Sequence, residues 1–201
     1  MNFPFLMAAI ALILTPGPDT LYTIARSTGQ GRKSGILSAL GVSAGIFVHT
    51  LTAAIGLSSL LMTSAIAYHS VKYLGAAYLI YLGIVTLTAK RKDFDLQKTD
   101  KGNLKTVFFQ GFLSNVLNPK VALFFLAFLP QFVNSDRGSI PLQIFALGTV
   151  YILLCALWLV LVALIASTAS TWLQKRSRFQ QWLTGSIFIS LGARLAIPET
   201  R

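Results

Sequence analysis

Long runs of apolar residues, separated by short polar segments, make up most of the chain. Each run has about 20 residues or more, and a helix of that length spans the roughly 30 Å hydrocarbon core of a membrane. The pattern predicts an all-α integral membrane protein with six transmembrane helices. The predicted spans are residues 3–25, 36–62, 71–89, 106–133, 142–168 and 179–197. Lys72 and Lys90 flank the third span, and we expect both to extend toward the headgroup layers.

The composition supports a membrane protein and excludes a soluble one. The 201-residue chain is 54% hydrophobic and only 11% charged, whereas a soluble domain carries roughly 25% charged residues. Six spans of about 20 residues use roughly 120 positions, which leaves no room for a soluble catalytic domain. We therefore treat residues 1–201 as a single transmembrane domain. The first basic residue, Arg26, follows the first apolar run, which is typical of a retained span rather than a cleaved signal peptide.

Basic residues are concentrated in alternate connections between the spans. The chain has 17 Lys and Arg and a formal net charge of +11. Three of these bases follow the first span, six lie in residues 90–105 and three follow the fifth span, so 12 of the 17 lie on one side. The positive-inside rule places these connections in the cytoplasm and both termini outside. The charge thus indicates topology and contact with anionic lipids rather than nucleic-acid binding.

The chain divides into two sets of three spans, repeat one (residues 1–89) and repeat two (residues 106–201), joined by a cytoplasmic linker at 90–105. The third spans resemble each other, because YLGAAYLIYLG at 73–83 and WLTGSIFISLG at 182–192 place aromatic, Leu, Ile and Leu-Gly residues at matching offsets. Since three is an odd number, the second set must cross the membrane in the opposite orientation to the first. The sequence therefore predicts an inverted repeat of two three-helix units.

The first span of each set carries a proline-containing interruption. Residues 14–19 read LTPGPD and residues 117–120 read LNPK. Proline lacks a backbone donor and clashes with the preceding turn, and Gly17 adds backbone freedom, so we expect helices 1 and 4 to be broken there. Interrupted spans at corresponding positions of two halves are typical of a transporter binding site near the midplane. The candidate substrate-binding residues are Pro16, Gly17, Pro18, Asp19, Asn115, Asn118, Pro119 and Lys120.

Each interruption is followed directly by a charged residue, Asp19 in the first and Lys120 in the second. A charge at that depth costs about 2.5–3.5 kcal/mol on insertion scales, so two of them by chance are not expected. One interpretation is an Asp19–Lys120 ion pair that only holds the two halves together. The other, which we favour, is a direct role in transport, and the two are compatible.

The polar residues of the fourth span have two interpretations. Asn115 and Asn118 are three apart and share one helical face. They could ligate a substrate amino group or cap the broken backbone, and capping is favoured for Asn118 because the residue before a proline is pushed out of the helix. The nearby Phe124, Phe125 and Phe128 are interpreted as lipid-facing or packing residues.

Three features of the second and fifth spans complete the candidates. His49 is the only histidine inside a span and could titrate near neutral pH, which makes it a coupling candidate beside Asp19, although a packed structural histidine is favoured. Gly41 and Gly45 form a small-residue face that allows close helix approach, either within the chain or in a homodimer. Cys155 is the only cysteine and is expected in the core.

Three blocks of the sequence resemble one known family. TPGPD in the first span, YLGAAYLIYLG in the third and NVLNPKVALFFLAFLPQF in the fourth are similar to the LysE/RhtB family of bacterial amino-acid exporters. The resemblance covers essentially the whole chain. It implies efflux of amino acids across the bacterial cytoplasmic (inner) membrane by proton antiport, with the neutral-substrate branch nearer than the basic one. Many relatives carry Asn after PGP, so the resemblance does not imply proton coupling through Asp19.

Other functional classes are disfavoured by the motifs. Neither GxSxG nor HExxH occurs, and the two histidines and one cysteine have no catalytic or zinc-binding spacing, so an enzyme, a metal exporter and a bound cofactor are not expected. Periodicity alone leaves open a polytopic membrane enzyme of another kind, a channel or a structural membrane protein. Labelled amino-acid counterflow discriminates, because only a carrier accelerates exchange.

The two charges suggest a coupling mechanism. The Lys120 ammonium would attract the carboxylate of a substrate amino acid, and this would weaken its pairing with Asp19. Asp19 would then take up a proton from outside and release it inside, opposite to the substrate movement. In this hypothesis Lys120 carries the substrate and Asp19, or failing that His49, carries the coupling proton.

The predicted topology can be tested by cysteine labelling in a Cys155→Ala background. A single cysteine replacing Ser135 should react with an impermeant thiol reagent added outside intact cells. One replacing Thr99, in the predicted cytoplasmic linker, should react only after permeabilisation. Labelling of the Thr99→Cys variant in intact cells would overturn the arrangement with both termini outside.

Overall fold

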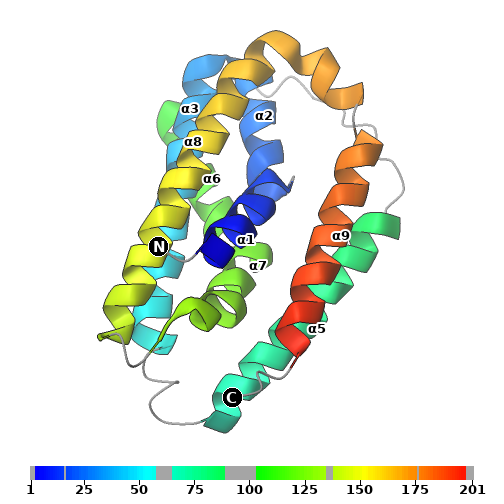
Figure 1. Ribbon diagram of the computed structural model, residues 1–201. Coiled ribbons are helices and arrows are strands. Elements are labelled where there is room, and N and C mark those ends of the chain that lie inside the picture. Colours follow the sequence, from blue (N-terminus) through cyan, green and yellow to red (C-terminus); the bar gives the residue numbers. More distant parts are fainter. Residues whose placement is uncertain are drawn as a thin grey trace.

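The computed structural model describes residues 3–15, 17–57, 65–88, 103–134, 138–175 and 177–197. Every regular element in these ranges is a helix, and Figure 1 shows their arrangement. The elements are α1 (Phe3–Leu14), α2 (Pro18–Gln30), α3 (Arg32–Thr52), η1 (Ala53–Leu57), α5 (Ala65–Thr88), α6 (Leu104–Val116), α7 (Pro119–Leu123), η2 (Phe124–Phe128), η3 (Leu129–Phe132), α8 (Ile140–Lys175) and α9 (Ser177–Ala196). The all-α expectation is confirmed for the described part of the chain.

Each predicted span overlaps one helix or a run of consecutive helices, although residues 58–62 of the second span and residue 89 of the third lie outside the described residues. The breaks predicted in the first and fourth spans are present, since α1 and α2 meet at 48° and α6 meets the segment after Pro119 at 46°. Within the described residues, two helices are long and apolar enough to cross a membrane by themselves, and four spans result if each bent pair counts as one. Because α5 and α9 are not among these, the count of six stays a prediction.

The lysines expected to flank the third span are Lys72 and Lys90. Lys72 does not extend from the end of a helix, because α5 begins seven residues earlier at Ala65 and the Lys72 side chain is only 4% exposed. Lys72 therefore does not mark the end of α5, and its expected position at the headgroups stays a prediction. Lys90 and residues 90–102 of the predicted linker lie outside the described residues. The described chain resumes at Asn103, whose side chain accepts a hydrogen bond from the Lys105 amide and caps α6.

The small-residue face of α3 packs inside the chain against α6. A Cβ atom at Gly41 would lie 2.1 Å from the Phe108 carbonyl oxygen, and one at Gly45 would lie 2.7 Å from Cβ of Asn115. Gly111 on α6 is equally close to α3, because its Cβ would lie 2.7 Å from the Ser38 carbonyl oxygen. Of the two interpretations of Gly41 and Gly45, the structure therefore shows internal helix packing.

The contacts between α5 and α9 are reciprocal. The two helices lie side by side (Figure 1) and contain the similar segments 73–83 and 182–192. A Cβ at Gly83 would lie 2.8 Å from the Gly185 carbonyl oxygen, and one at Gly192 would lie 2.7 Å from the Ala76 carbonyl oxygen. Gly83 corresponds to Gly192 in the two segments, and Ala76 corresponds to Gly185. Each contact therefore turns into the other when the segments are exchanged, as a two-fold relation between antiparallel helices requires.

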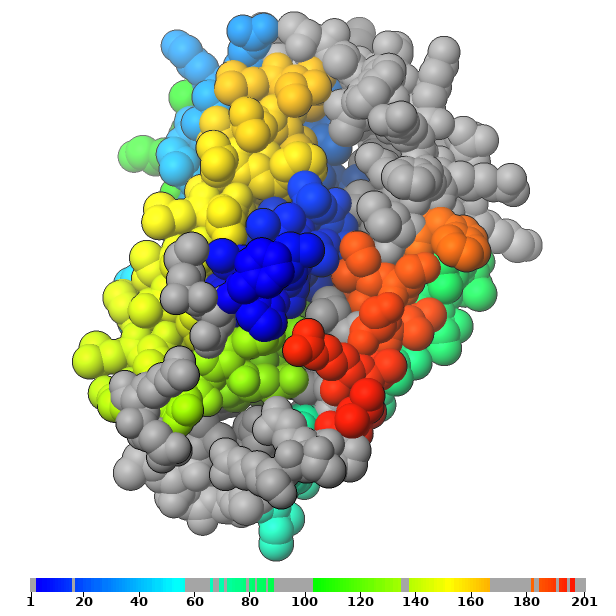
Figure 2. All heavy atoms as spheres, viewed as in Figure 1, coloured from blue at the N-terminus to red at the C-terminus, as the bar shows by residue number. Residues whose placement is uncertain are grey.

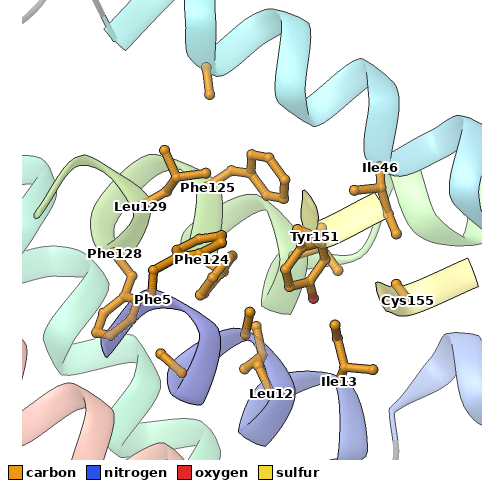
Figure 3. Close-up of a cluster of buried hydrophobic side chains, with 14 of the residues drawn as sticks. Phe5, Leu12, Ile13, Ile46, Phe124, Phe125, Phe128, Leu129, Tyr151 and Cys155 are labelled. Atoms are coloured by element: carbon orange, nitrogen blue, oxygen red, sulfur yellow. The ribbon is translucent and has the colours of Figure 1, made fainter. Parts of the chain in front are cut away.

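An aromatic cluster fills the space between α1, η2 and α8 (Figure 3). Phe5, Phe124, Phe125 and Phe128 are each 1% exposed, and the ring of Tyr151 lies 4.9 Å from that of Phe124. The three phenylalanines of the fourth span are thus core residues and do not face lipid. Leu153, Leu157 and Leu161 instead form an exposed row on α8, as expected for a helix surrounded by lipid. Figure 2 shows α1 at the surface between α8 and α9.

The close approach of α3 and α6 can be tested with one methyl group. Gly41→Ala should lower the melting temperature of the purified protein strongly, because its Cβ would collide with the fixed backbone of α6. Gly56→Ala is the matched control, since a Cβ there meets nothing within 4 Å. Equal melting temperatures for the two variants would contradict the packing described.

Candidate functional site

The break in the first span leaves backbone carbonyls without helical donors. In an α-helix the carbonyl of Leu12 would accept from the amide of residue 16, and that of Leu14 from residue 18. Both positions are proline, which has no N–H. The helix accordingly ends at Leu14, and α2 begins with Pro18 at its first position. Pro16 lies outside the described residues.

The break in the fourth span has the same local plan. Pro119 stands at the first position of α7, and Asn118 before it has extended backbone with φ of −79° and ψ of 106°. The Asn118 side-chain oxygen accepts a hydrogen bond from the Lys120 amide at 3.1 Å. The capping role favoured for Asn118 is therefore confirmed. In both breaks a charged residue directly follows the proline, Asp19 on α2 and Lys120 on α7.

The carboxylate of Asp19 reaches across to the fourth span. Its Oδ2 atom accepts hydrogen bonds from Nδ2 of Asn115 at 2.8 Å and from Nδ2 of Asn118 at 2.9 Å. All three side chains are buried, with exposed fractions of 9%, 0% and 3% respectively. Two amide donors on one buried carboxylate oxygen offset part of the cost of removing the charge from water. The other oxygen, Oδ1, is buried and has no hydrogen-bond partner among the described residues.

The ammonium of Lys120 reaches in the opposite direction, to the first span. Its Nζ atom donates to the carbonyl oxygen of Leu12 at 2.8 Å and to that of Thr15 at 2.9 Å. The Leu12 carbonyl is one of those that the prolines deprive of a helical donor, so the ammonium replaces a missing backbone amide. The ring of Phe188 on α9 lies 5.6 Å from Nζ and adds a cation–π contact.

The Asp19 and Lys120 side chains thus extend in opposite directions, each to the other break, and do not contact each other. Each side chain is held by the other break, and the structure gives no direct ion pair between these two described residues. The purely structural Asp19–Lys120 pair considered from the sequence is therefore not formed here. Each charge lies where a helix end favours it, Asp19 at the amino end of α2 and the Lys120 ammonium at the carboxyl end of α1.

Gly17 provides space for this crossing. Its φ of −136° and ψ of −175° are extended values that any residue adopts, so conformational freedom does not explain the glycine. A Cβ at this position would lie 3.3 Å from Nζ of Lys120. The absence of a side chain is what lets the ammonium approach the carboxyl end of α1.

His49 joins the site through the backbone of Asn115. Its Nε2 atom lies 3.0 Å from the Asn115 carbonyl oxygen, and its ring stacks on Phe125 at 6.1 Å. With Nε2 protonated, the ring donates to that carbonyl, a tautomer that this contact requires. Asn115 therefore connects His49 to Asp19, because its backbone carbonyl contacts the histidine ring and its side-chain amide donates to the carboxylate.

The structure brings together most of the residues predicted for the site. Asp19, Asn115, Asn118, Lys120 and Gly17 form the crossed arrangement, whereas Pro18 and Pro119 serve to begin helices. The sequence interpretation missed the contribution of α8. Tyr151, 2% exposed, and Cys155, 7% exposed, both belong to the buried cluster that also contains Leu12 of α1 and Phe124 of η2. A tyrosine in an otherwise apolar span was the signal available for Tyr151. Among the described residues no group of three His, Cys, Asp or Glu could hold a metal ion.

Known proteins similar to this chain share its membrane character. A family model described as LysE type translocator matches residues 10–199. A membrane protein of Bacillus subtilis (strain 168), named as uncharacterized membrane protein YrhP, is 34% identical, covering 96% of this chain and 97% of its own length. The leucine efflux protein of Salmonella typhi is 30% identical, covering 98% of this chain and 94% of its own length. No solved structure matches the chain.

The double role of Asn118 predicts an unusually costly substitution. Asn118→Ala removes a helix cap and also one donor to the buried Asp19 carboxylate, so we expect a loss of about 2–4 kcal/mol in unfolding free energy. Asn103→Ala is the matched control, because Asn103 makes the same 3.1 Å bond to an amide two residues on, at an exposed helix start. That control should lose only about 1 kcal/mol. Denaturant titration in detergent measures both, and equal losses would contradict the contact with Asp19.

Proposed function

The chain belongs to the LysE type translocator family, and we propose that it exports neutral amino acids or close derivatives from the bacterial cytoplasm. The observation that carries this proposal is the crossed pair of charges at two broken helices. An amino acid is a zwitterion, and a site with one buried carboxylate and one ammonium offers a partner to each of its charges. The relatives named as leucine efflux proteins favour the neutral branch.

Lys120 is the proposed partner of the substrate carboxylate. Two of the three N–H groups of its ammonium are occupied by the Leu12 and Thr15 carbonyls. A carboxylate makes stronger, charge-assisted bonds than a neutral carbonyl, so an arriving substrate can compete for these donors. Binding would then loosen the hold of Lys120 on the carboxyl end of α1. Substrate arrival would thereby be transmitted to the first span.

Asp19 is the proposed carrier of the coupling proton in antiport. Its Oδ2 is held by two amides, while its buried Oδ1 has no hydrogen-bond partner in the described part of the chain. A proton on Oδ1 would neutralise the charge and leave both amide bonds in place. The coupling hypothesis drawn from the sequence assumed that the substrate separates a paired Asp19 and Lys120. The two residues already have separate partners, so coupling would pass through the movement of α1 and α2 relative to α6 and α7. His49 is the alternative carrier through Asn115.

The proposed setting is a six-span protein of the inner membrane, with an inverted repeat and both termini outside. The reciprocal contacts of Gly83 with Gly185 and of Gly192 with Ala76 support the two-fold relation between the halves. The breaks add a second reciprocal pair, since Asp19 contacts Asn118 while Lys120 lies against Gly17. Alternating access would then consist of movement of one repeat against the other around the breaks. Since α6 covers Gly41 and Gly45, a homodimer would use another surface.

Lys120 variants in proteoliposomes test the function. Lys120→Ala should reduce counterflow of labelled leucine, threonine or homoserine by about tenfold or more, because a charge-assisted bond to the substrate is lost. Lys120→Arg should restore little, since a planar fork replaces a compact ammonium between two carbonyls. Lys105→Ala, at an exposed position on α6, is the matched control and should exchange normally.

Membrane insertion and melting temperature, measured for each variant, separate loss of transport from loss of fold. A Lys120→Ala variant that inserts, melts normally and exchanges at the wild-type rate would remove Lys120 from the site. Absence of counterflow for any amino acid in the wild type would overturn the export function itself.

A further inference from the structure

Tyr151 on α8 is a buried polar group that the crossed site does not use. The side chain is 2% exposed, and its hydroxyl makes no hydrogen bond with any described residue. A buried tyrosine hydroxyl normally finds a partner, because leaving a polar group unpaired in an apolar environment is costly. The Tyr151 hydroxyl is therefore available to donate a hydrogen bond to a ligand.

The ring of Tyr151 is held in a fixed direction. It packs against Phe124 at 4.9 Å and, edge to face, against Phe125 at 5.5 Å. Both phenylalanines belong to η2, which directly follows the α7 helix that carries Lys120. Packing against these two rings restrains where the hydroxyl points, so it is preorganised in the way that a binding residue needs.

Figure 3 shows where the hydroxyl points. It projects toward Leu12 and Ile13 at the carboxyl end of α1. The carbonyl of Leu12 is one of the two that hold the Lys120 ammonium. The Tyr151 hydroxyl and the Lys120 ammonium therefore approach the same end of α1 from α8 and α7.

We propose that the Tyr151 hydroxyl is a second hydrogen-bond donor to the substrate carboxylate that Lys120 attracts. This inference rests on the proposed export function and deepens it, because it assigns recognition of the free carboxylate to two donors from different helices. An ammonium attracts a carboxylate but imposes little orientation on it, whereas a phenol hydroxyl held in place by packing donates its hydrogen bond in one direction. The site then distinguishes an amino acid from its amide, which lacks the negative charge.

The test compares an amino acid with its amide in Tyr151→Phe. This variant keeps the packed ring and removes only the hydroxyl, and Tyr81→Phe, at a tyrosine 58% exposed on α5, is the matched control. The probe is whichever of leucine, threonine and homoserine exchanges fastest in the wild type, together with its amide. Half-saturation of counterflow, or half-inhibition by the amide, measures each affinity, and the melting temperature checks the fold.

We expect Tyr151→Phe to weaken the free amino acid about tenfold and the amide less than about twofold, with Tyr81→Phe unchanged. Unchanged affinity for the amino acid, or an equal loss for acid and amide, would overturn the inference. Both of those results leave the export function standing, because the variant still exchanges. A wild type that exchanges none of the three amino acids would overturn the proposed function and this inference with it.

Discussion

The structure depends on one constraint, that backbone carbonyls and amides inside a membrane need partners from within the protein. Two prolines in the first span remove two of the amides that would serve the end of α1, at positions 16 and 18. The Lys120 ammonium supplies a replacement by donating to Leu12 and Thr15. A lysine that would otherwise be costly at this depth thus offsets the cost of a broken helix. The same contact fixes α7 against α1, which are far apart in the sequence.

Asp19 contacts the other break through side chains, because its carboxylate accepts from the amides of Asn115 and Asn118. Asn118 must leave the helix because Pro119 follows it, and its amide then has to satisfy both the start of α7 and a buried acid. Asn115 adds a second donor to that acid and connects His49 through its carbonyl. The structural and functional interpretations of the two charges are therefore compatible. In the proposed mechanism, the two charged groups that connect the breaks in this structure are also those that a substrate or a proton would engage.

Local sequence rules predicted a large part of this arrangement. Proline positions fixed the breaks to within a few residues, and the residue before Pro119 was correctly expected to cap. Composition and period predicted helices in the right places, from α1 to α9. These features depend on residues that are close together in the chain, so a single sequence is enough to predict them.

What the sequence did not predict depends on contacts between distant segments. The residues next to Lys120 in the sequence do not indicate that its ammonium donates to the carbonyls of α1 rather than to Asp19. Those next to Lys72 likewise do not indicate that its side chain, on α5, is buried. In the sequence Tyr151 resembles any aromatic residue of an apolar span, and only the fold brings Phe124 and Phe125 of η2 against its ring. Phe124, Phe125 and Phe128 likewise could face lipid or core, and only the position of α8 and α1 decides between them.

The central claim is that the two charges have separate roles in transport. Asp19 carries the coupling proton, and Lys120 binds the substrate. The most direct measurement is transport by Asp19→Asn proteoliposomes with and without an imposed pH gradient. The amide oxygen of the variant can still accept from Asn115 and Asn118, so the fold should survive. The account predicts that the variant exchanges labelled for unlabelled amino acid but no longer accumulates it in response to the gradient. Accumulation with unchanged pH dependence would contradict the account and move the coupling proton to another residue, with His49 the first to examine.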